Sequence, residues 1–137
     1  MQSILVLCTG NSCRSQMAEG YLKLFAATQA NIFSAGIKAH GVNLRAVDIM
    51  KEDGIDISNQ TSNTVDDFRG KDFDFIITVC DNAKENCPVF PSRSKRFHHY
   101  FPDPAIATGS DAEIQNEFRR ARDMIKAYCR SFVEENI

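Results

Sequence analysis

The segment Cys8-Thr9-Gly10-Asn11-Ser12-Cys13-Arg14-Ser15 constrains this chain most, because it separates an apolar run from a helical pattern. Residues 4–7 before it are all apolar, which is typical of a central parallel strand covered on both faces. Gly10 and Asn11 tolerate positive φ, so successive backbone N–H groups can turn inward around an anion. The dipole of the following helix points at the same place. These features predict an oxyanion-binding loop between a strand and a helix.

Three side chains of this loop predict nucleophilic chemistry. A Cys8 thiolate would lie in a positive field and would be a nucleophile at neutral pH. Arg14 offers a planar fork of donors that fits two oxygens of a tetrahedral oxyanion, and Ser15 supplies a hydroxyl. The alternative is that Cys8 is a small buried hydrophobe and the loop an ordinary turn. The strand-to-helix context favours the catalytic interpretation. The expected oxyanion-binding residues are Thr9, Gly10, Asn11, Ser12, Cys13, Arg14 and Ser15, with the Cys13 side chain either at the anion or turned into the core.

Length and composition indicate one globular domain, residues 1–137, with 43% hydrophobic and 25% charged residues. The net charge of −2 offers no basic field for nucleic acid. No apolar run approaches the length of a membrane span, and the N-terminus lacks the pattern of a signal peptide. We therefore expect a cytoplasmic protein that binds neither nucleic acid nor membrane, and we expect a monomer.

Strand and helix patterns alternate along the chain. Helices are expected from residue 16 to about 27, from 43 to 53 with Asn43 as N-cap, and from a Ser110–Glu113 capping box onward. Strands are expected at 31–36, 72–79 and 95–101, with a helical turn at 65–68. The first helix has a stripe of Met17, Tyr21, Leu24 and Phe25, and Arg119, Arg120 and Arg122 form a solvated face of the last helix. The alternation predicts an α/β fold, a single-domain doubly wound sheet of about four parallel strands flanked by helices.

Five cysteines are present, and their odd number argues against a complete disulfide framework. A zinc site formed by Cys8, Cys13, Cys80 and Cys87 is an alternative, but the spacing suits structural zinc poorly. Cys80 directly follows a predicted strand, at the edge of the sheet where Cys8 also lies, so the two thiols can converge. The polar segment 81–86, bounded by Cys87-Pro88, suits a weakly held helical turn that could unwind during function.

Two further positions bear on function. Asp103 stands between two prolines at a strand's C-terminal end, where it is either a general acid or base above the Cys8 loop or simply the first residue of a turn. The pattern does not decide between these. His40 follows the second predicted strand in a loop, and the sequence assigns it no role.

The arrangement Cys8-x5-Arg14-Ser15 after the first strand resembles the signature of low-molecular-weight tyrosine phosphatases. Together with Asp103-Pro104, Cys80 and Cys87, the chain resembles a thioredoxin-coupled arsenate reductase of that fold. The matching segments are residues 8–20, 34–36 and 54–62 and the Cys80/Cys87 pair, and the resemblance extends from Leu5 to the last helix.

The resemblance implies reduction of arsenate to arsenite through a Cys8–arsenic adduct, with Asp103 donating a proton to the departing oxygen. Cys80 would then attack Cys8, and Cys87 would attack Cys80, leaving a Cys80–Cys87 disulfide for thioredoxin. No tightly bound cofactor is implied: the electrons come from reduced thioredoxin or a glutaredoxin-like protein. Relatives that bind K⁺ use residues matching Asn11, Glu19 and Ser34 and an acid at the position of Asn63, and the missing acid argues against such a site here.

Two alternatives remain from the sequence. A low-molecular-weight tyrosine phosphatase would need only Cys8, Arg14 and Asp103. Such relatives usually place aromatic residues after Asp-Pro, whereas Pro104 is followed by Ala105-Ile106-Ala107, so only weak hydrolysis of small aryl phosphates is expected. The third interpretation is a non-enzymatic one, an oxyanion-binding or thiol-based redox sensor that shares the fold.

Overall fold

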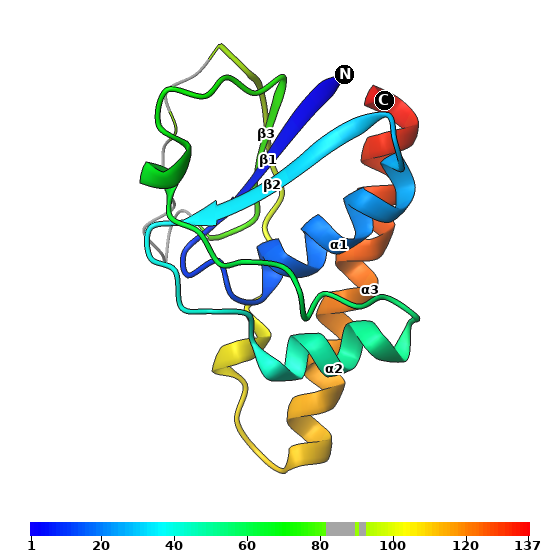
Figure 1. Ribbon diagram of the computed structural model, residues 1–137. Helices are drawn as coiled ribbons and strands as arrows, with labels where there is room; N and C mark the ends of the chain where they lie inside the picture. Colours follow the sequence, from blue (N-terminus) through cyan, green and yellow to red (C-terminus); the bar gives the residue numbers. More distant parts are fainter. Residues whose placement is uncertain (82–89, 91–92) are drawn as a thin grey trace.

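The computed structural model describes residues 1–81, 90 and 93–137, and a parallel sheet lies at its centre (Figure 1). Its strands are β1 (Gln2–Cys8), β2 (Ala30–Gly36), β3 (Phe75–Thr78) and β4 (Lys95–His98). The spatial order is β2-β1-β3-β4, and all three pairs are parallel. Residues 4–7 of β1 have no exposed surface. The predicted α/β fold, with a central first strand in a sheet of four parallel strands, is confirmed.

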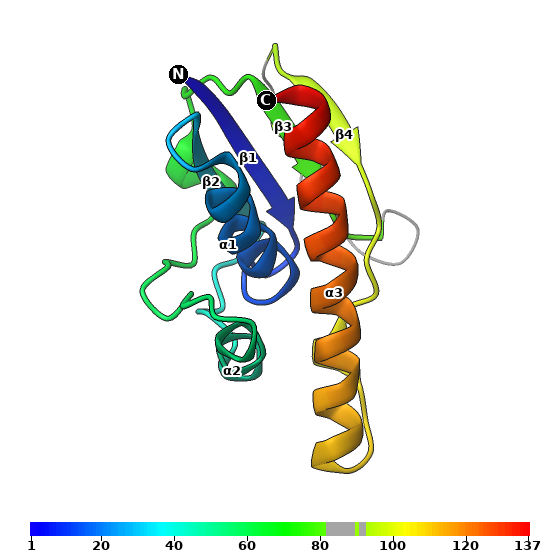
Figure 2. The same ribbon diagram turned by 90° about the vertical axis from the view of Figure 1, so that its right-hand side faces the viewer.

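Helices α1 (Arg14–Ala26) and α3 (Asp111–Asn136) lie side by side against one face of the sheet (Figure 2). Helix α2 (Leu44–Glu52) packs against both of them. Ile4 and Val6 point into this core, while Leu5 and Leu7 point to the opposite face, as the alternation along a strand requires. The opposite face is covered by the 3₁₀ turn η1 (Val65–Phe68) and by a cluster of aromatic side chains. That cluster is Phe33, Phe68, Phe73 and Phe90, in edge-to-face contacts.

The helix boundaries follow the predicted capping residues. Asn43 Oδ1 accepts hydrogen bonds from the N–H groups of Arg45 (2.9 Å) and Ala46 (3.1 Å), which fixes the start of α2. Ser110 and Glu113 form the predicted capping box at the start of α3, and each satisfies a backbone N–H of the other. Local sequence signals are thus sufficient to place these two helix starts.

Strands β3 and β4 are shorter than predicted. Before β3, the Asp74 N–H donates to the Ser3 carbonyl at 3.0 Å, but the Ser3 N–H donates at 2.8 Å to the Asp74 carboxylate and not to a backbone carbonyl. After β4, the N–H groups of His99 and Phe101 still donate to the Thr78 (2.9 Å) and Val79 (3.2 Å) carbonyls. The chain then reaches Pro102 and the 3₁₀ turn η2 (Pro104–Ile106). Proline has no N–H to donate to a ladder. Isolated backbone hydrogen bonds thus extend the pairing beyond the two strands, and Pro102 ends it after β4.

Two side-chain placements differ from the prediction. Leu24 is 55% exposed, and Leu22 takes its place in the core, because α1 is buried on a broad face between the sheet and α3. Arg122 is buried, whereas Arg119 and Arg120 lie on the surface as predicted. Arg122 Nη1 donates to the Ile49 carbonyl at 2.9 Å, at the end of α2. The predicted solvated face of arginines is therefore wrong for Arg122, which joins α2 to α3.

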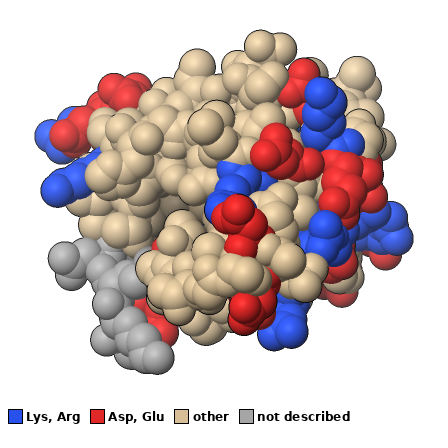
Figure 3. Space-filling view, turned by 90° about the horizontal axis from the view of Figure 1, so that it is seen from below, with Lys and Arg blue, Asp and Glu red and all other residues tan. Residues whose placement is uncertain are grey.

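Charges of both signs alternate along the α2–α3 contact. Hydrogen bonds from Arg119 and Arg122 lower the pKa of Glu52 to about 2, so this carboxylate stays charged. In Figure 3, acidic and basic side chains stand next to one another over this end of the molecule, and no broad field of one sign appears on this face. None of the helices in the described ranges is long and apolar enough to cross a membrane.

The core of α3 can be tested with a neighbouring pair of residues. Ile125 has no exposed surface, whereas Met124 beside it is 41% exposed. Ile125→Ala leaves a cavity and is expected to lower the free energy of unfolding by about 2–5 kcal/mol. Met124→Ala is the matched control, with an expected change of about 0.5 kcal/mol or less. Urea denaturation checks both. Similar losses for the two variants would contradict the assigned packing of α3.

Candidate active site

The loop that links β1 to α1 forms the floor of a pocket at the carboxyl end of β1. It starts at Cys8, the last residue of β1, and ends at Arg14, the first residue of α1. Asn11 within it has a φ of 45°, a left-handed conformation that asparagine tolerates better than most residues. The predicted strand, tight loop and helix start are confirmed.

The carbonyl groups of this loop face outward and are anchored by the segment after β2. Backbone N–H groups of that segment donate to three of them. The bonds are Ile37 (2.8 Å) and Lys38 (3.2 Å) to Thr9, His40 (3.1 Å) to Gly10, and Asn43 (2.9 Å) to Ser12. Because a trans peptide points its N–H opposite its carbonyl, the loop N–H groups are directed toward the pocket. The anchored carbonyls make the loop a cradle for an anion.

Asn11 is held from a second side. Its carbonyl accepts from Gln16 Nε2 (3.0 Å) and Ser62 Oγ (2.8 Å), and its Oδ1 accepts from the Asn63 N–H (2.7 Å). Asn11 has no exposed surface. The left-handed conformation is therefore fixed by tertiary contacts from residues 62 and 63, which the sequence alone did not indicate.

Cys8 is free and nearly fully buried, and its sulfur lies 2.8 Å from Ser15 Oγ. Ser15 Oγ also accepts a hydrogen bond from Asn11 Nδ2 at 2.8 Å. The hydroxyl hydrogen of Ser15 can therefore point at the sulfur, which is the orientation that assists a thiolate nucleophile. Ser15 acts from behind the loop and does not line the pocket.

Arg14 and Asp103 face each other across the pocket. Arg14 Nη1 donates to the Phe101 carbonyl at 3.1 Å, and its Nη2 lies 3.6 Å from Asp103 Oδ2. Asp103 Oδ1 accepts from the Ala105 N–H at 3.0 Å and so caps η2. One carboxylate oxygen thus begins a turn while the other points at the site. Both interpretations left open by the sequence are compatible with this geometry.

The pocket has a volume of about 330 Å³. Asp103 and most of the predicted oxyanion-binding residues line it, whereas Asn11 and Ser15 support the loop from behind. Two lining residues, His40 and Ala105, were missed by the sequence analysis, because their proximity depends on how the segments after β2 and β4 fold over the loop. The residues are Cys8, Thr9, Gly10, Ser12, Cys13, Arg14, His40, Asp103 and Ala105.

Cys13 lines the pocket but is a poor nucleophile. It is 5% exposed, and burial raises the pKa of its thiol far above the ordinary value, with the charges of Asp103 and Cys8 acting in the same direction. A protonated thiol neither attacks nor binds metal well. Cys129 on α3 is likewise free, and burial raises its pKa too.

Cys80 stands two residues beyond β3, on the strand that neighbours β1. The Val79 N–H donates to the Leu7 carbonyl at 3.0 Å, so Cys80 and Cys8 lie at the same edge of the sheet. Cys80 is fully buried and disulfide-bonded. Cys87 lies outside the described residues. The predicted placement of Cys8 and Cys80 at one sheet edge agrees with the structure.

The four residues considered for K⁺ do come together, behind the loop. Ser34 Oγ accepts from Asn11 Nδ2 (2.8 Å) and donates to Glu19 Oε1 (2.5 Å), and Asn63 binds Asn11 as described above. Lys23 Nζ donates to the other Glu19 oxygen at 2.5 Å. An ammonium therefore already neutralises the carboxylate, and the residues do not fit a K⁺ ion in this arrangement. No cluster of three or more His, Cys, Asp or Glu suited to a metal occurs in the part of the chain that the structure describes.

Comparison with known proteins shows the family to which this chain belongs. A family model described as low molecular weight phosphotyrosine protein phosphatase matches residues 3–136. The chain belongs to this phosphatase family. A relative from Halalkalibacterium halodurans named arsenate reductase is 50% identical over 131 residues, which cover 96% of this chain and 94% of the relative. One of the same name from Bacillus subtilis is 48% identical with the same coverage. A solved structure described as an arsenate reductase in the phosphate-binding state is 31% identical, with a TM-score of 0.82 and 98% of both chains covered.

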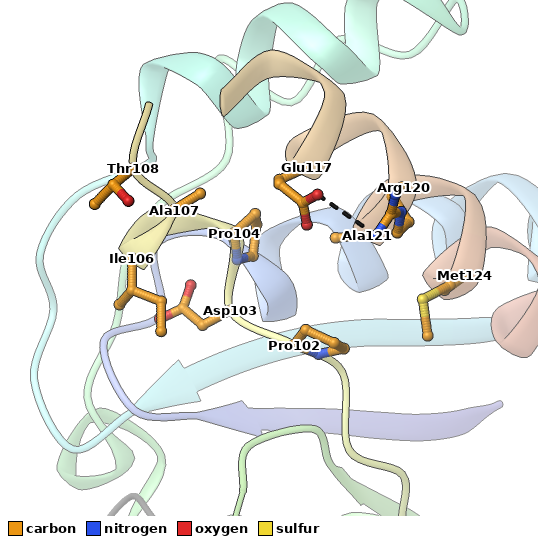
Figure 4. Close-up of a pocket in the computed structure, with 10 residues that line it drawn as sticks. All are labelled: Pro102, Asp103, Pro104, Ile106, Ala107, Thr108, Glu117, Arg120, Ala121 and Met124. Carbon is orange, nitrogen blue, oxygen red and sulfur yellow. Dashed lines mark ion pairs between the residues drawn. The ribbon is translucent and has the colours of Figure 1, made fainter. Parts of the chain in front are cut away.

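A second cavity lies beside η2, on the side that faces away from the loop between β1 and α1 (Figure 4). Its volume is about 370 Å³, and it is lined by residues of η2 and its neighbours on one side and by residues of α3 on the other. Pro102, Pro104 and Ile106 form an apolar wall, and Glu117 and Arg120 pair at 3.5 Å on the side of α3. Asp103 lines both cavities. The segment that carries this carboxylate therefore lies between the two cavities.

The close approach of Gly36 to the loop is testable. A Cβ at Gly36 would lie 2.6 Å from the Thr9 carbonyl oxygen and 2.8 Å from the Asn11 nitrogen, which are backbone atoms. Gly36→Ala is expected to lower the free energy of unfolding by about 1–3 kcal/mol and to weaken binding of inorganic phosphate. Urea denaturation and phosphate titration by calorimetry measure the two effects.

Gly20→Ala is the control for this prediction. A Cβ there would meet the side-chain ends of Ile57 (2.8 Å) and Met50 (3.0 Å), far from the loop. It is expected to leave phosphate affinity unchanged, whatever its effect on stability. Parental phosphate affinity in Gly36→Ala would show that the loop does not depend on this contact.

Proposed function

We propose that this chain reduces arsenate to arsenite through a Cys8–arsenic adduct and a disulfide cascade re-reduced by thioredoxin. One observation carries the proposal: a free Cys8 lies in an oxyanion pocket, and a disulfide-bonded Cys80 lies two residues beyond the neighbouring strand. That combination is what such a cascade leaves after the thiol of Cys8 has been released. The two relatives with 50% and 48% sequence identity are both named arsenate reductase, which supports the same reaction.

The first step forms the adduct. The Cys8 thiolate attacks the arsenic atom of arsenate, which the loop N–H groups and Arg14 hold through its oxygens. Asp103 protonates the departing oxygen, which leaves as water, and a sulfur–arsenic(V) bond remains. The buried guanidinium of Arg14, fixed by the Phe101 carbonyl, needs little reorganisation to stabilise the charge.

The second and third steps move two electrons. The reduced Cys80 thiolate attacks Cys8 Sγ, the sulfur–arsenic bond breaks toward arsenic, and arsenite leaves as Cys8 and Cys80 form a disulfide. Cys87 then attacks Cys80 Sγ and releases the Cys8 thiolate. The dithiol of thioredoxin, or of a glutaredoxin-like protein, reduces the Cys80–Cys87 disulfide. Reduction by such proteins is typical of the cytoplasm, where we propose that the enzyme acts as a monomer.

Family membership favours a second candidate, hydrolysis of phosphate monoesters by Cys8, Arg14 and Asp103 alone. Among the described residues, His40, Asp103 and Ala105 line the pocket beyond the loop, and none of these three offers a large aromatic surface to a phenol ring. We therefore propose only a weak residual activity on small aryl phosphates. A disulfide-bonded Cys80 has no part in ester hydrolysis, which requires no electrons.

The decisive measurement is NADPH consumption with thioredoxin, thioredoxin reductase and arsenate. Steady consumption with arsenate and none with phosphate is expected, because phosphorus in a thiophosphoryl adduct is hydrolysed and not reduced. Cys87→Ser is expected to complete one turnover and stop as a Cys8–Cys80 disulfide. Cys80→Ser should release no arsenite.

Cys129→Ala serves as the matched control, since Cys129 is a free thiol on α3 outside the pocket. It is expected to retain multiple turnover. Sustained turnover by Cys87→Ser with thioredoxin would contradict the role of Cys87. Hydrolysis of para-nitrophenyl phosphate without any arsenate-dependent NADPH consumption would favour the phosphatase.

We propose in addition that turnover does not depend on K⁺, because Lys23 already neutralises Glu19 behind the loop. Replacing NaCl by KCl at constant ionic strength should leave the rate of the parent protein unchanged. Lys23→Ala removes the ammonium from a carboxylate that is only 8% exposed, so its activity should fall and KCl should restore part of it. Stimulation of the parent by KCl would refute this.

A further inference from the structure

Beyond the loop itself, the described part of the chain gives the pocket three walls: His40, Asp103 and Ala105. Asp103 already has a place in the proposed reaction, and Ala105 presents only a methyl group. His40 is different, because its imidazole carries two nitrogens that can donate or accept a hydrogen bond. His40 is therefore a polar pocket-lining residue to which the proposed reaction gives no role.

His40 is fixed to the loop in two ways. Its backbone N–H donates to the Gly10 carbonyl at 3.1 Å. Its ring lies against Gly10, since a Cβ added there would be 2.6 Å from His40 Cδ2 and 3.6 Å from Nε2. Although the residue is exposed, both its backbone and its ring are positioned by the oxyanion loop. The imidazole thus stands at the rim of the pocket in a defined place.

The two candidate substrates differ at this rim. In arsenate, the oxygen that points away from Cys8 is the departing oxygen that Asp103 protonates, and as a free oxygen or hydroxyl it can take a second hydrogen-bonding partner. In an aryl phosphate, an aromatic ring extends from that position and is best held by an apolar wall. A site built to hydrogen-bond a substrate oxygen discriminates against an analogue that lacks it.

We propose that His40 determines specificity: its imidazole hydrogen-bonds the outward oxygen of the bound oxyanion and disfavours aryl esters. The inference rests on the proposed function for the identity of the substrate, arsenate. The His40 contact lies in that same pocket and takes no part in the transfer of electrons. The role concerns binding, so it can be measured with phosphate, which binds as a tetrahedral oxyanion and is not reduced.

The test compares His40→Phe, which keeps a ring and removes both nitrogens, with His40→Gln, which keeps a donor and an acceptor. Calorimetric titration with inorganic phosphate gives the dissociation constant, and kinetics give kcat/KM for arsenate and for para-nitrophenyl phosphate. His40→Phe should weaken phosphate binding about tenfold, the value of one good hydrogen bond to a charged group. It should also shift the ratio of the two kcat/KM values toward the aryl phosphate. His40→Gln should retain most of the phosphate affinity.

Lys38→Ala is the matched control. The Lys38 N–H anchors the same loop through the Thr9 carbonyl at 3.2 Å, but its side chain does not line the pocket. Removing its charge affects two dianionic substrates alike, so the ratio should not change. Parental phosphate affinity and an unchanged ratio in His40→Phe would overturn the inference. If the parent protein does not reduce arsenate, the proposed function is refuted. Weaker phosphate binding by His40→Phe would then still support the His40 contact.

Discussion

The outward carbonyl groups of residues 9–12 need hydrogen-bond donors from outside the loop, and the rest of the site depends on that need. An anion cradle must keep its N–H groups for the ligand, so its carbonyls have to be satisfied elsewhere. The segment after β2 supplies four backbone donors. It can do so only because β2 lies next to β1 and because Gly36 allows the two backbones to approach closely. The sheet order and the glycine are therefore requirements of the loop.

A second layer of polar side chains continues from the loop to the surface. Cys8, Ser15, Asn11, Ser34, Glu19 and Lys23 form an unbroken series of hydrogen bonds. Within the described ranges, no buried side-chain nitrogen or oxygen lacks a partner. Burying so many polar groups is costly unless every one is paired, and a fully paired network holds each member in one orientation. The network thus fixes the loop from the side opposite the substrate.

Features set by adjacent residues could be predicted from the sequence, whereas features set by packing could not. The loop, the Asn43 cap and the Ser110–Glu113 capping box depend on residues within a few positions of one another. The sequence predicts Arg122 on the surface together with Arg119 and Arg120, because arginine is usually exposed and none of the three belongs to the apolar stripe. Arg122 is buried because α2 ends beside it and offers a carbonyl and a carboxylate. His40 was given no role for the same reason: its position over Gly10 arises from the path of a loop, which has no periodic signal.

The position of β1 between β2 and β3 also explains how one fold can serve two chemistries. The β2 side of β1 supplies the donors that hold the oxyanion loop. The segment after β4 supplies Asp103 and the Phe101 carbonyl that holds Arg14, and these parts together suffice for the chemistry of an ester hydrolase. The β3 side places Cys80 at the same sheet edge, two residues past the strand. A thiol there leaves this anchoring untouched, because the backbone donors to the Thr9, Gly10 and Ser12 carbonyls among the described residues all come from the segment after β2. The proposed reductase therefore differs from a phosphatase by additions along β3 and at the rim of the pocket, while the loop stays the same.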